Sequence, residues 1–238
     1  MEKDNLTFVS GYWKVKNKYT HEKYVEWFRN SLNINQRYIF FCEERDNEFI
    51  KSFRNGYETI FINYSITDFY SNKFYNNNWV DNYHCPSIEL GKIWHEKIHL
   101  LKLAKDYDIN LGKSTTFYMW ADAGVCVYRD ISPPAVRFNY YGLEQEKIYY
   151  SSCNDHPITG CYMVHKNIID TMHKLYYKTL KEYKTNKLYL SDQHILTILL
   201  KNYPKYFLHS ARGYGEVLNS ILYNVLKANE NDNKCLIY

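Results

Sequence analysis

Short runs rich in β-branched and aromatic residues alternate with amphipathic helical patterns along this 238-residue chain. The runs predict seven strands, over residues 6–13, 37–42, 58–63, 115–121, 147–151, 158–164 and 205–209. Several runs, such as residues 38–42, are apolar throughout, which is typical of strands covered on both faces. The early order of strand, helix, strand, strand, helix, strand therefore predicts an α/β fold with a mostly parallel central sheet flanked by helices.

Between these runs, apolar residues recur at helical spacing and predict five helices. They are expected to begin after Thr20, to cover residues 92–105, to run from Asn167 to Tyr183 and from Ser191 to Tyr203, and to cover residues 216–227. Residues 64–86, rich in Asn and Tyr, are expected to form a mobile excursion. Because no stretch rich in Pro, Ser or Gly divides the chain, we predict a single domain over residues 1–228 and a C-terminal tail over residues 229–238.

Charge and motif content argue against several classes of protein. The formal net charge of +4 is smaller than a dedicated nucleic-acid binder carries, so we expect no nucleic-acid partner. The chain has neither G-x-G-x-x-G nor G-x-x-x-x-G-K-[ST], which argues against a dinucleotide-binding Rossmann site and a P-loop. No apolar run approaches the ~20 residues of a membrane span, and the first residues lack a secretory signal pattern, so we expect a soluble, cytoplasmic protein.

The apolar run over residues 115–121 leads directly into Asp122, Ala123 and Gly124. Ligands of open α/β sheets bind beyond the carboxyl ends of the strands, where this carboxylate is expected to emerge. Its oxygens suit a hard cation such as Mn²⁺ or Mg²⁺, which in turn neutralises a diphosphate. Taken alone, however, the tripeptide is better explained as a turn after a strand.

Two basic residues have two interpretations each. Lys97 lies beside the inward face of the helix predicted over residues 92–105. A buried lysine is rare unless it is paired, so its cation either meets phosphates or a partner such as Asp122, or reaches past the helix to water. Arg129, just beyond the aspartate, is either a surface residue or a fork for a phosphate.

Asp192 and Gly160 also leave alternatives open. Asp192 follows Ser191 at the first turn of a predicted helix, where the helix dipole favours a negative charge whether or not the residue is functional. Gly160 lies within a predicted strand, and marks either the close approach of an acceptor to the backbone or a bulge.

The sequence Trp120-Ala121-Asp122-Ala123-Gly124 resembles the aspartate motif of the HtrL/YibB-like family of glycosyltransferases. Further segments of the chain resemble motifs of the same family and follow one another in the same order. They lie within residues 6–210, at 8–13, 93–97, 158–163 and 191–193. The order is also similar to that of the retaining enzymes related to glycogenin and to the lipopolysaccharide galactosyltransferases. The resemblance implies a GT-A-like, Rossmann-like domain that transfers a sugar from a UDP- or GDP-sugar to a glycan or protein acceptor.

The resemblance also implies roles for individual residues. The donor would be bound by Ser10, Gly11, Tyr12, Lys97, Asp122, Gly124 and Arg129, and the acceptor would pass Gly160. Asp122 and His209 would hold Mn²⁺ or Mg²⁺ on the donor. Asp192 would be the general base of an inverting enzyme, or Asp192 or Gln193 would stabilise the oxocarbenium-like centre of a retaining one.

One position departs from the pattern of these enzymes. Their acidic motif carries two aspartates separated by one residue, and here Trp120 occupies the first position. The departure weakens the expectation of a metal more than the expectation of the fold. It also supports an alternative function, a catalytically weak GT-A-like module that recognises a glycan or a partner.

Overall fold

Seven strands form one sheet in the order β3-β2-β1-β4-β6-β5-β7 in the computed structural model, which describes residues 5–133, 143–154 and 156–223. The strands are β1 (Leu6–Tyr12), β2 (Tyr38–Cys42), β3 (Thr59–Asn63), β4 (Phe117–Ala121), β5 (Ile148–Cys153), β6 (His156–His165) and β7 (Phe207–Arg212). Only β6 runs against its neighbours, and every other pairing in the described sheet is parallel. The predicted α/β fold with a mostly parallel central sheet flanked by helices is confirmed.

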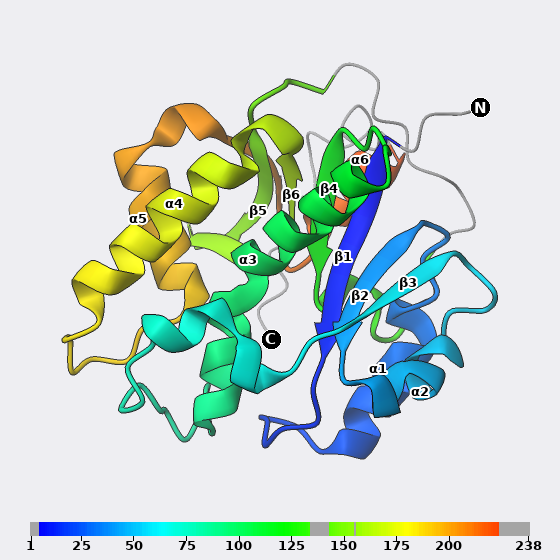
Figure 1. Cartoon of the computed structure of the whole chain (residues 1–238), viewed down its shortest axis with the longest axis horizontal. Coiled ribbons are helices and arrows are strands. Elements are labelled where there is room, and N and C mark those ends of the chain that lie inside the picture. Colours follow the sequence, from blue (N-terminus) through cyan, green and yellow to red (C-terminus); the bar gives the residue numbers. More distant parts are fainter. Residues whose placement is uncertain (1–4, 134–142, 155, 224–238) are drawn as a thin grey trace.

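Helices cover both faces of this sheet (Figure 1). One face carries α3 (Ile88–Asn110), α4 (Lys166–Tyr183) and α5 (Asp192–Asn202), and the other carries α1 (His21–Ser31), α2 (Asn47–Lys51) and α6 (Glu216–Tyr223). Successive residues of a strand point to opposite faces, so Val9 packs in the first core and its neighbour Phe8 in the second. This double covering explains why the strands read as continuous apolar runs.

The helix starts follow from capping side chains. Thr20 accepts a hydrogen bond from the Lys23 N–H, and Ser191 accepts one from the His194 N–H, as predicted for both. The start predicted at Asn167 is wrong by one residue, since α4 begins at Lys166 with His165 as its cap. Helix α6 is described as far as Tyr223, so the rest of its predicted span and the predicted tail at 229–238 lie outside the described residues.

Helix α3 is longer than predicted and buries ionisable side chains that its pattern concealed. It begins after Ser87, whose hydroxyl caps Leu90, and it ends at Asn110 rather than Lys105. Its buried residues extend beyond the predicted span at both ends, to Leu90 and to Asp108, and include the ionisable Glu96 and Lys97 between them.

Residues 64–86 pack against α3 instead of standing out from the domain. Phe69 and Trp79 are buried there. The buried Glu96 carboxylate accepts hydrogen bonds from the Tyr64 hydroxyl and from the backbone N–H groups of Tyr70 and Ser71. The expectation of a mobile excursion missed these contacts because they join residues 25 to 32 positions apart.

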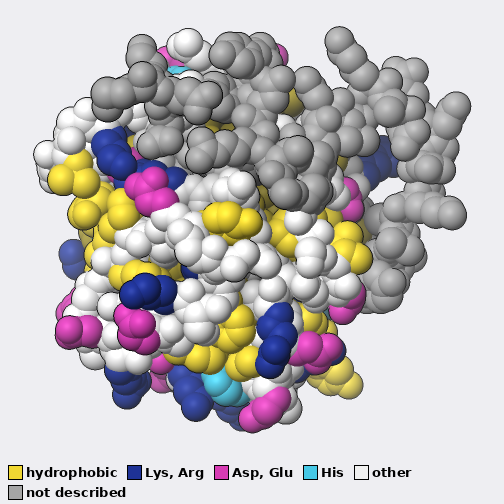
Figure 2. Space-filling model, turned by 90° about the vertical axis from the view of Figure 1, so that its right-hand side faces the viewer, with side chains coloured by type: hydrophobic (Ala, Val, Ile, Leu, Met, Phe, Trp, Pro, Cys, Tyr) yellow, Lys and Arg dark blue, Asp and Glu magenta, His cyan; other side chains and the backbone are white. Residues whose placement is uncertain are grey.

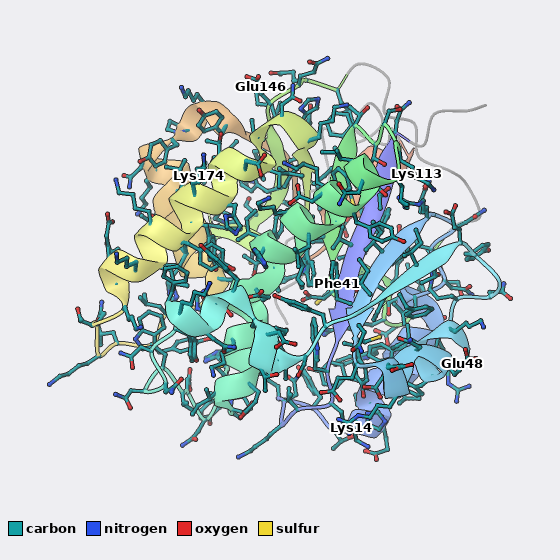
Figure 3. The ribbon with its side chains drawn as sticks, in the orientation of Figure 1. Lys14, Phe41, Glu48, Lys113, Glu146 and Lys174 are labelled. Carbon is teal, nitrogen blue, oxygen red and sulfur yellow. The ribbon has the colours of Figure 1, made fainter. Side chains whose placement is uncertain are left out.

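The carboxyl ends of the parallel strands and their amino ends face opposite ends of the molecule. Figure 3 shows Lys14 just past the carboxyl end of β1 at the bottom of the view and Lys113, beyond α3, at the top. On the side that carries β3, α1 and α2, basic and acidic side chains are interspersed (Figure 2). In an open α/β sheet, ligands bind beyond the carboxyl ends of the parallel strands, so a ligand site is expected at that end of the sheet.

Candidate active site

A cleft with two adjoining lobes lies at the carboxyl edge of the sheet. The first lobe, of about 720 Å³, lies against the end of β1 and the helix α1. The second lobe, of about 550 Å³, lies against the start of β6 and the start of α5. The lobes share a set of lining residues, which are Lys18, His84, Trp94, Lys97, Asp122, Cys126 and Tyr214. Lys97 and Asp122 therefore lie where the two lobes meet.

At this junction, the Lys97 ammonium joins two carboxylates that are 70 residues apart in the chain. Its Nζ lies 3.1 Å from Asp122 Oδ1 and 3.0 Å from Asp192 Oδ2. It also donates a hydrogen bond of 3.1 Å to the carbonyl of Thr159. The side chains of Lys97 and Asp192 are 5% and 7% exposed, whereas that of Asp122 is 40% exposed, so Asp122 faces the cleft.

Burial and charge act in opposite directions on Lys97. Burial alone lowers the pKa of its ammonium, but the negative charges of Asp122 and Asp192 raise it by more, so the net pKa lies above the ordinary value. Lys97 is therefore a charged, paired lysine rather than one that reaches past its helix to water. Of the alternatives left open by the sequence, the pairing of Lys97 with Asp122 is the one that is formed.

Asp122 is held from three sides. Its backbone N–H donates to the Gly160 carbonyl at 2.8 Å, which extends the β4–β6 pairing by one step. The Trp120 indole N–H donates to Asp122 Oδ1 at 2.8 Å, so that oxygen already has two donors. The other carboxylate oxygen, Oδ2, lies over Gly160, where an added Cβ would stand 3.2 Å from it.

Gly160→Ala is expected to disturb Asp122 more than the fold. The methyl group requires Oδ2 to shift by a few tenths of an ångström. Displacing a side chain from its working position in an active site slows the reaction, here the predicted sugar transfer, by roughly tenfold. The unfolding temperature should stay near that of the wild type. In an Asp122→Ala background the same glycine substitution should have no further effect on rate, and an equal loss in both backgrounds would contradict this role.

Asp192 is the first residue of α5. Its Oδ1 accepts a hydrogen bond of 2.9 Å from the Gln193 N–H. Its Oδ2 is buried and has no well-aligned hydrogen bond among the described residues, so its 3.0 Å contact with Lys97 is an ion pair. Gln193 lines the second lobe beside it. A partly satisfied carboxylate oxygen therefore remains at the junction of the lobes.

The two lobes differ in charge. Among the described residues, the first lobe has five basic side chains, Lys14, Lys18, Lys23, Lys97 and Arg129, against Asp122 and Asp130. The second lobe has Lys18 and Lys97 against Asp81, Asp122 and Asp192. The first lobe thus favours an anionic ligand, and the second favours a neutral or weakly cationic one.

Most of the predicted donor residues line the first lobe. Gly11, Tyr12, Gly124 and Arg129 join Lys97 and Asp122 there. The Arg129 guanidinium stacks 3.8 Å from the centre of the Trp27 ring and donates to the Gly124 carbonyl at 2.9 Å. It is therefore placed by the protein before any ligand arrives. Gly160, Asp192 and Gln193, to which acceptor and catalytic roles were assigned from the sequence, line the second lobe.

Two predicted site residues do not reach the cleft. Ser10 is fully buried between strands, and its hydroxyl donates to the Ala121 carbonyl at 2.7 Å. Its side chain therefore ties β1 to the end of β4 and lines neither lobe of the cleft.

His209 is separated from Asp122 by the width of two strands. Trp120, Tyr162, Tyr150 and His209 lie side by side on β4, β6, β5 and β7. Three strand spacings separate Trp120 from His209 by roughly 14 Å. The His209 imidazole is 2.8 Å from the Ser152 hydroxyl. The predicted pairing of His209 with Asp122 is therefore not formed, and the turn after β7, with Tyr214 and Gly215, reaches the cleft instead.

Several lining residues escaped the sequence reasoning. Trp94 lies three residues before Lys97 on α3, where the two share a helix face, so that spacing was a usable signal. Tyr189 packs against the Trp94 ring at 6.5 Å, and Lys18 lies 5.4 Å from the centre of the same ring. No local pattern brings these two residues to Trp94, because each arrives from a separate loop.

Within the described part of the chain, none of the helices is both long and apolar enough to span a membrane. No protein-family model and no curated protein matches the sequence. The resemblance to the HtrL/YibB-like proteins is therefore not confirmed and stays a prediction. Among solved structures, the chain is similar to the PaToxG glycosyltransferase, with a TM-score of 0.40 and 15% identity over 92% of this chain and 74% of that one.

Proposed function

We propose that the protein is a glycosyltransferase that takes a sugar from a nucleotide-diphosphate sugar, with UDP or GDP as the nucleotide, and transfers it to a hydroxyl of a glycan or protein acceptor. The observation that carries the proposal is the two-lobed cleft at the carboxyl edge of the sheet, with Lys97, Asp122 and Asp192 joined where the lobes meet. A group-transfer enzyme needs two adjoining sites with its reactive groups between them.

The first lobe suits the donor. Its five basic side chains supply charge for a diphosphate, and the preset Arg129 offers a planar fork to phosphate oxygens. Tyr19, which is 49% exposed, and Tyr24 line the same lobe and provide aromatic surface for a base or ribose. Asp122, exposed at the inner end of the lobe, is placed to accept hydrogen bonds from hydroxyl groups of the sugar or ribose.

The second lobe suits a hydroxyl-bearing acceptor. Trp94 and Tyr189 give it apolar ring surface. Because Asp192 Oδ2 is buried, Oδ1 is the oxygen of that carboxylate left to accept a hydroxyl proton. In an inverting transfer, the acceptor oxygen bonds to the anomeric carbon as the bond from that carbon to the diphosphate breaks. The acceptor proton then passes to Asp192, and the nucleoside diphosphate leaves. In a retaining transfer, Asp192 or Gln193 stabilises the oxocarbenium-like centre while the leaving phosphate takes the proton.

UDP or GDP is expected to raise the unfolding temperature of the protein. A ligand at a hundredfold excess over its Kd stabilises the folded state by about 2.7 kcal/mol, or roughly 5–10 °C for a domain of this size. A thermal-shift screen of nucleotides and nucleotide sugars measures this directly. Uridine and guanosine, which lack the diphosphate, serve as controls and should give much smaller shifts. If no nucleotide or nucleotide sugar shifts the transition, the proposed function is wrong.

One observation favours a second candidate, a GT-A-like module that binds a glycan or partner without turnover. Lys97 engages both carboxylates of the junction and leaves neither entirely free to react. The two candidates differ in a single measurement, the release of nucleoside diphosphate from a nucleotide sugar that binds. Binding without transfer and without slow donor hydrolysis would support the module.

A further inference from the structure

The divalent cation that the GT-A-like fold implies does not fit the residues at the end of β4. The first acidic position of the motif is filled by Trp120, which is 1% exposed and donates its indole N–H to Asp122 Oδ1. His209, the predicted second ligand, lies across two intervening strands. Among the described residues, no group of three or more His, Cys, Asp or Glu side chains is placed to hold a metal ion.

The position where such a cation would be expected already holds a positive charge. The Lys97 ammonium is surrounded by three oxygens at 3.0 to 3.1 Å: Asp122 Oδ1, Asp192 Oδ2 and the Thr159 carbonyl. Oxygen atoms from carboxylates and carbonyls are also what a hard cation seeks. A divalent ion on the remaining Asp122 oxygen would lie within a few ångströms of the ammonium, with like charges in a partly buried site.

The charge of a diphosphate is matched elsewhere in the cleft. Lys14, Lys18 and Arg129 line the first lobe next to Lys97. Lys18 lies at the boundary of the two lobes over the Trp94 ring. These side chains supply positive charge in the lobe that Asp122 also lines.

From these contacts we infer that the Lys97 ammonium takes the place of a divalent cation, and that the donor diphosphate is bound by the basic side chains of the first lobe without a metal. This inference rests on the proposed function. Lys97 acts as the permanent counter-ion of Asp122 and Asp192, and it keeps their oxygens at fixed positions around the junction of the lobes.

The direct test compares nucleotide binding with and without a divalent ion. UDP and GDP are titrated into the wild-type protein by calorimetry, once in EDTA and once in MnCl₂. For whichever nucleotide binds, we expect the Kd values in the two buffers to agree within about threefold. Binding that is at least tenfold tighter with Mn²⁺ would overturn the inference and leave the proposed function standing. Binding of neither nucleotide in either buffer would overturn the proposed function itself, and the inference with it.

A variant tests the same inference without any nucleotide. Lys97→Met leaves the Asp122 and Asp192 carboxylates facing one vacated position, so this variant is expected to gain a Mn²⁺ site that the wild type lacks. Electron paramagnetic resonance of Mn²⁺ counts the bound ions. Lys105→Met removes another buried lysine of α3, whose partner Asp170 lies on α4 rather than in the cleft, and should bind no more Mn²⁺ than the wild type. Mn²⁺ bound by the wild type at the same low concentration would contradict the inference even if Lys97→Met fails to fold.

Discussion

Asp192→Asn is expected to lower the rate of sugar transfer by about 10²- to 10⁴-fold, the usual contribution of a positioned general acid or base. The amide is nearly the same size as the carboxylate, and its single carbonyl oxygen can face either the Lys97 ammonium or the Gln193 N–H, so the substitution changes charge more than volume. It can neither take the acceptor proton nor supply a full negative charge to the anomeric centre. Steady-state kinetics should show the loss in kcat, while the Kd of the nucleotide changes by only a few fold.

The matched control for this substitution is Glu89→Gln. Glu89 is also a carboxylate in the first turn of a helix, but it is exposed and does not line either lobe. Both variants lose a similar helix-dipole interaction of about 0.3–1 kcal/mol. If the two variants transfer sugar equally well, Asp192 serves only its helix and the catalytic role is wrong.

The anomeric outcome of the reaction then separates the two mechanisms. A product of inverted configuration assigns to Asp192 the removal of the acceptor proton, and a product of retained configuration assigns to it the stabilisation of positive charge. NMR of the first product formed by the wild type distinguishes the anomers before they equilibrate. Gln193→Ala should then leave the rate of an inverting transfer nearly unchanged and lower the rate of a retaining one, because Gln193 was predicted to act only in the retaining reaction.

The sequence predicted the sheet well because its signals are local. Runs such as Tyr38–Cys42 are apolar on both faces, and this pattern alone marks a buried strand. The position of β6, inserted antiparallel between β4 and β5, was not predicted. That placement depends on contacts between residues such as Met119 and Met163, which no window of neighbouring residues contains.

Only part of the candidate site was predicted, because only some of its residues carry a local sequence signal. Lys97, Asp122 and Asp192 each carry a local signal, a strand end or a helix turn, and the structure brings all three together. His209, predicted to hold the metal with Asp122, lies within β7, and among the described residues that follow it Tyr214 and Gly215 line the cleft instead. The pairing register of β7 decides which of its residues lie at the carboxyl end of the sheet, and the sequence pattern of β7 does not specify that register.

A second buried ion pair lies at the opposite edge of the sheet, away from the cleft. Arg37 forms two hydrogen bonds to Asp108, at 2.7 and 3.0 Å, with side chains that are 2% and 0% exposed. Asp108 also accepts hydrogen bonds from the hydroxyls of Thr115 and Tyr118. Burial lowers the pKa of Arg37, but the negative charges of Asp108 and Glu58 raise it by more, so the guanidinium stays charged. The pair ties the start of β2 to the end of α3 and the start of β4.

Arg37→Met is therefore expected to lower the free energy of unfolding by about 3–5 kcal/mol, because it leaves the Asp108 carboxylate buried without its counter-ion. Urea denaturation followed by circular dichroism measures the loss. Lys105→Met is the matched control: Asp170, its partner, is 50% exposed and stays hydrated, so the loss there should be about 0–1 kcal/mol. Adding Asp108→Leu to Arg37→Met should recover much of the stability, since no unpaired charge then remains in the core. Equal losses for the two single variants would show that Asp108 reaches water when Arg37 is removed, and that the amino edge of the sheet is held by its apolar packing alone.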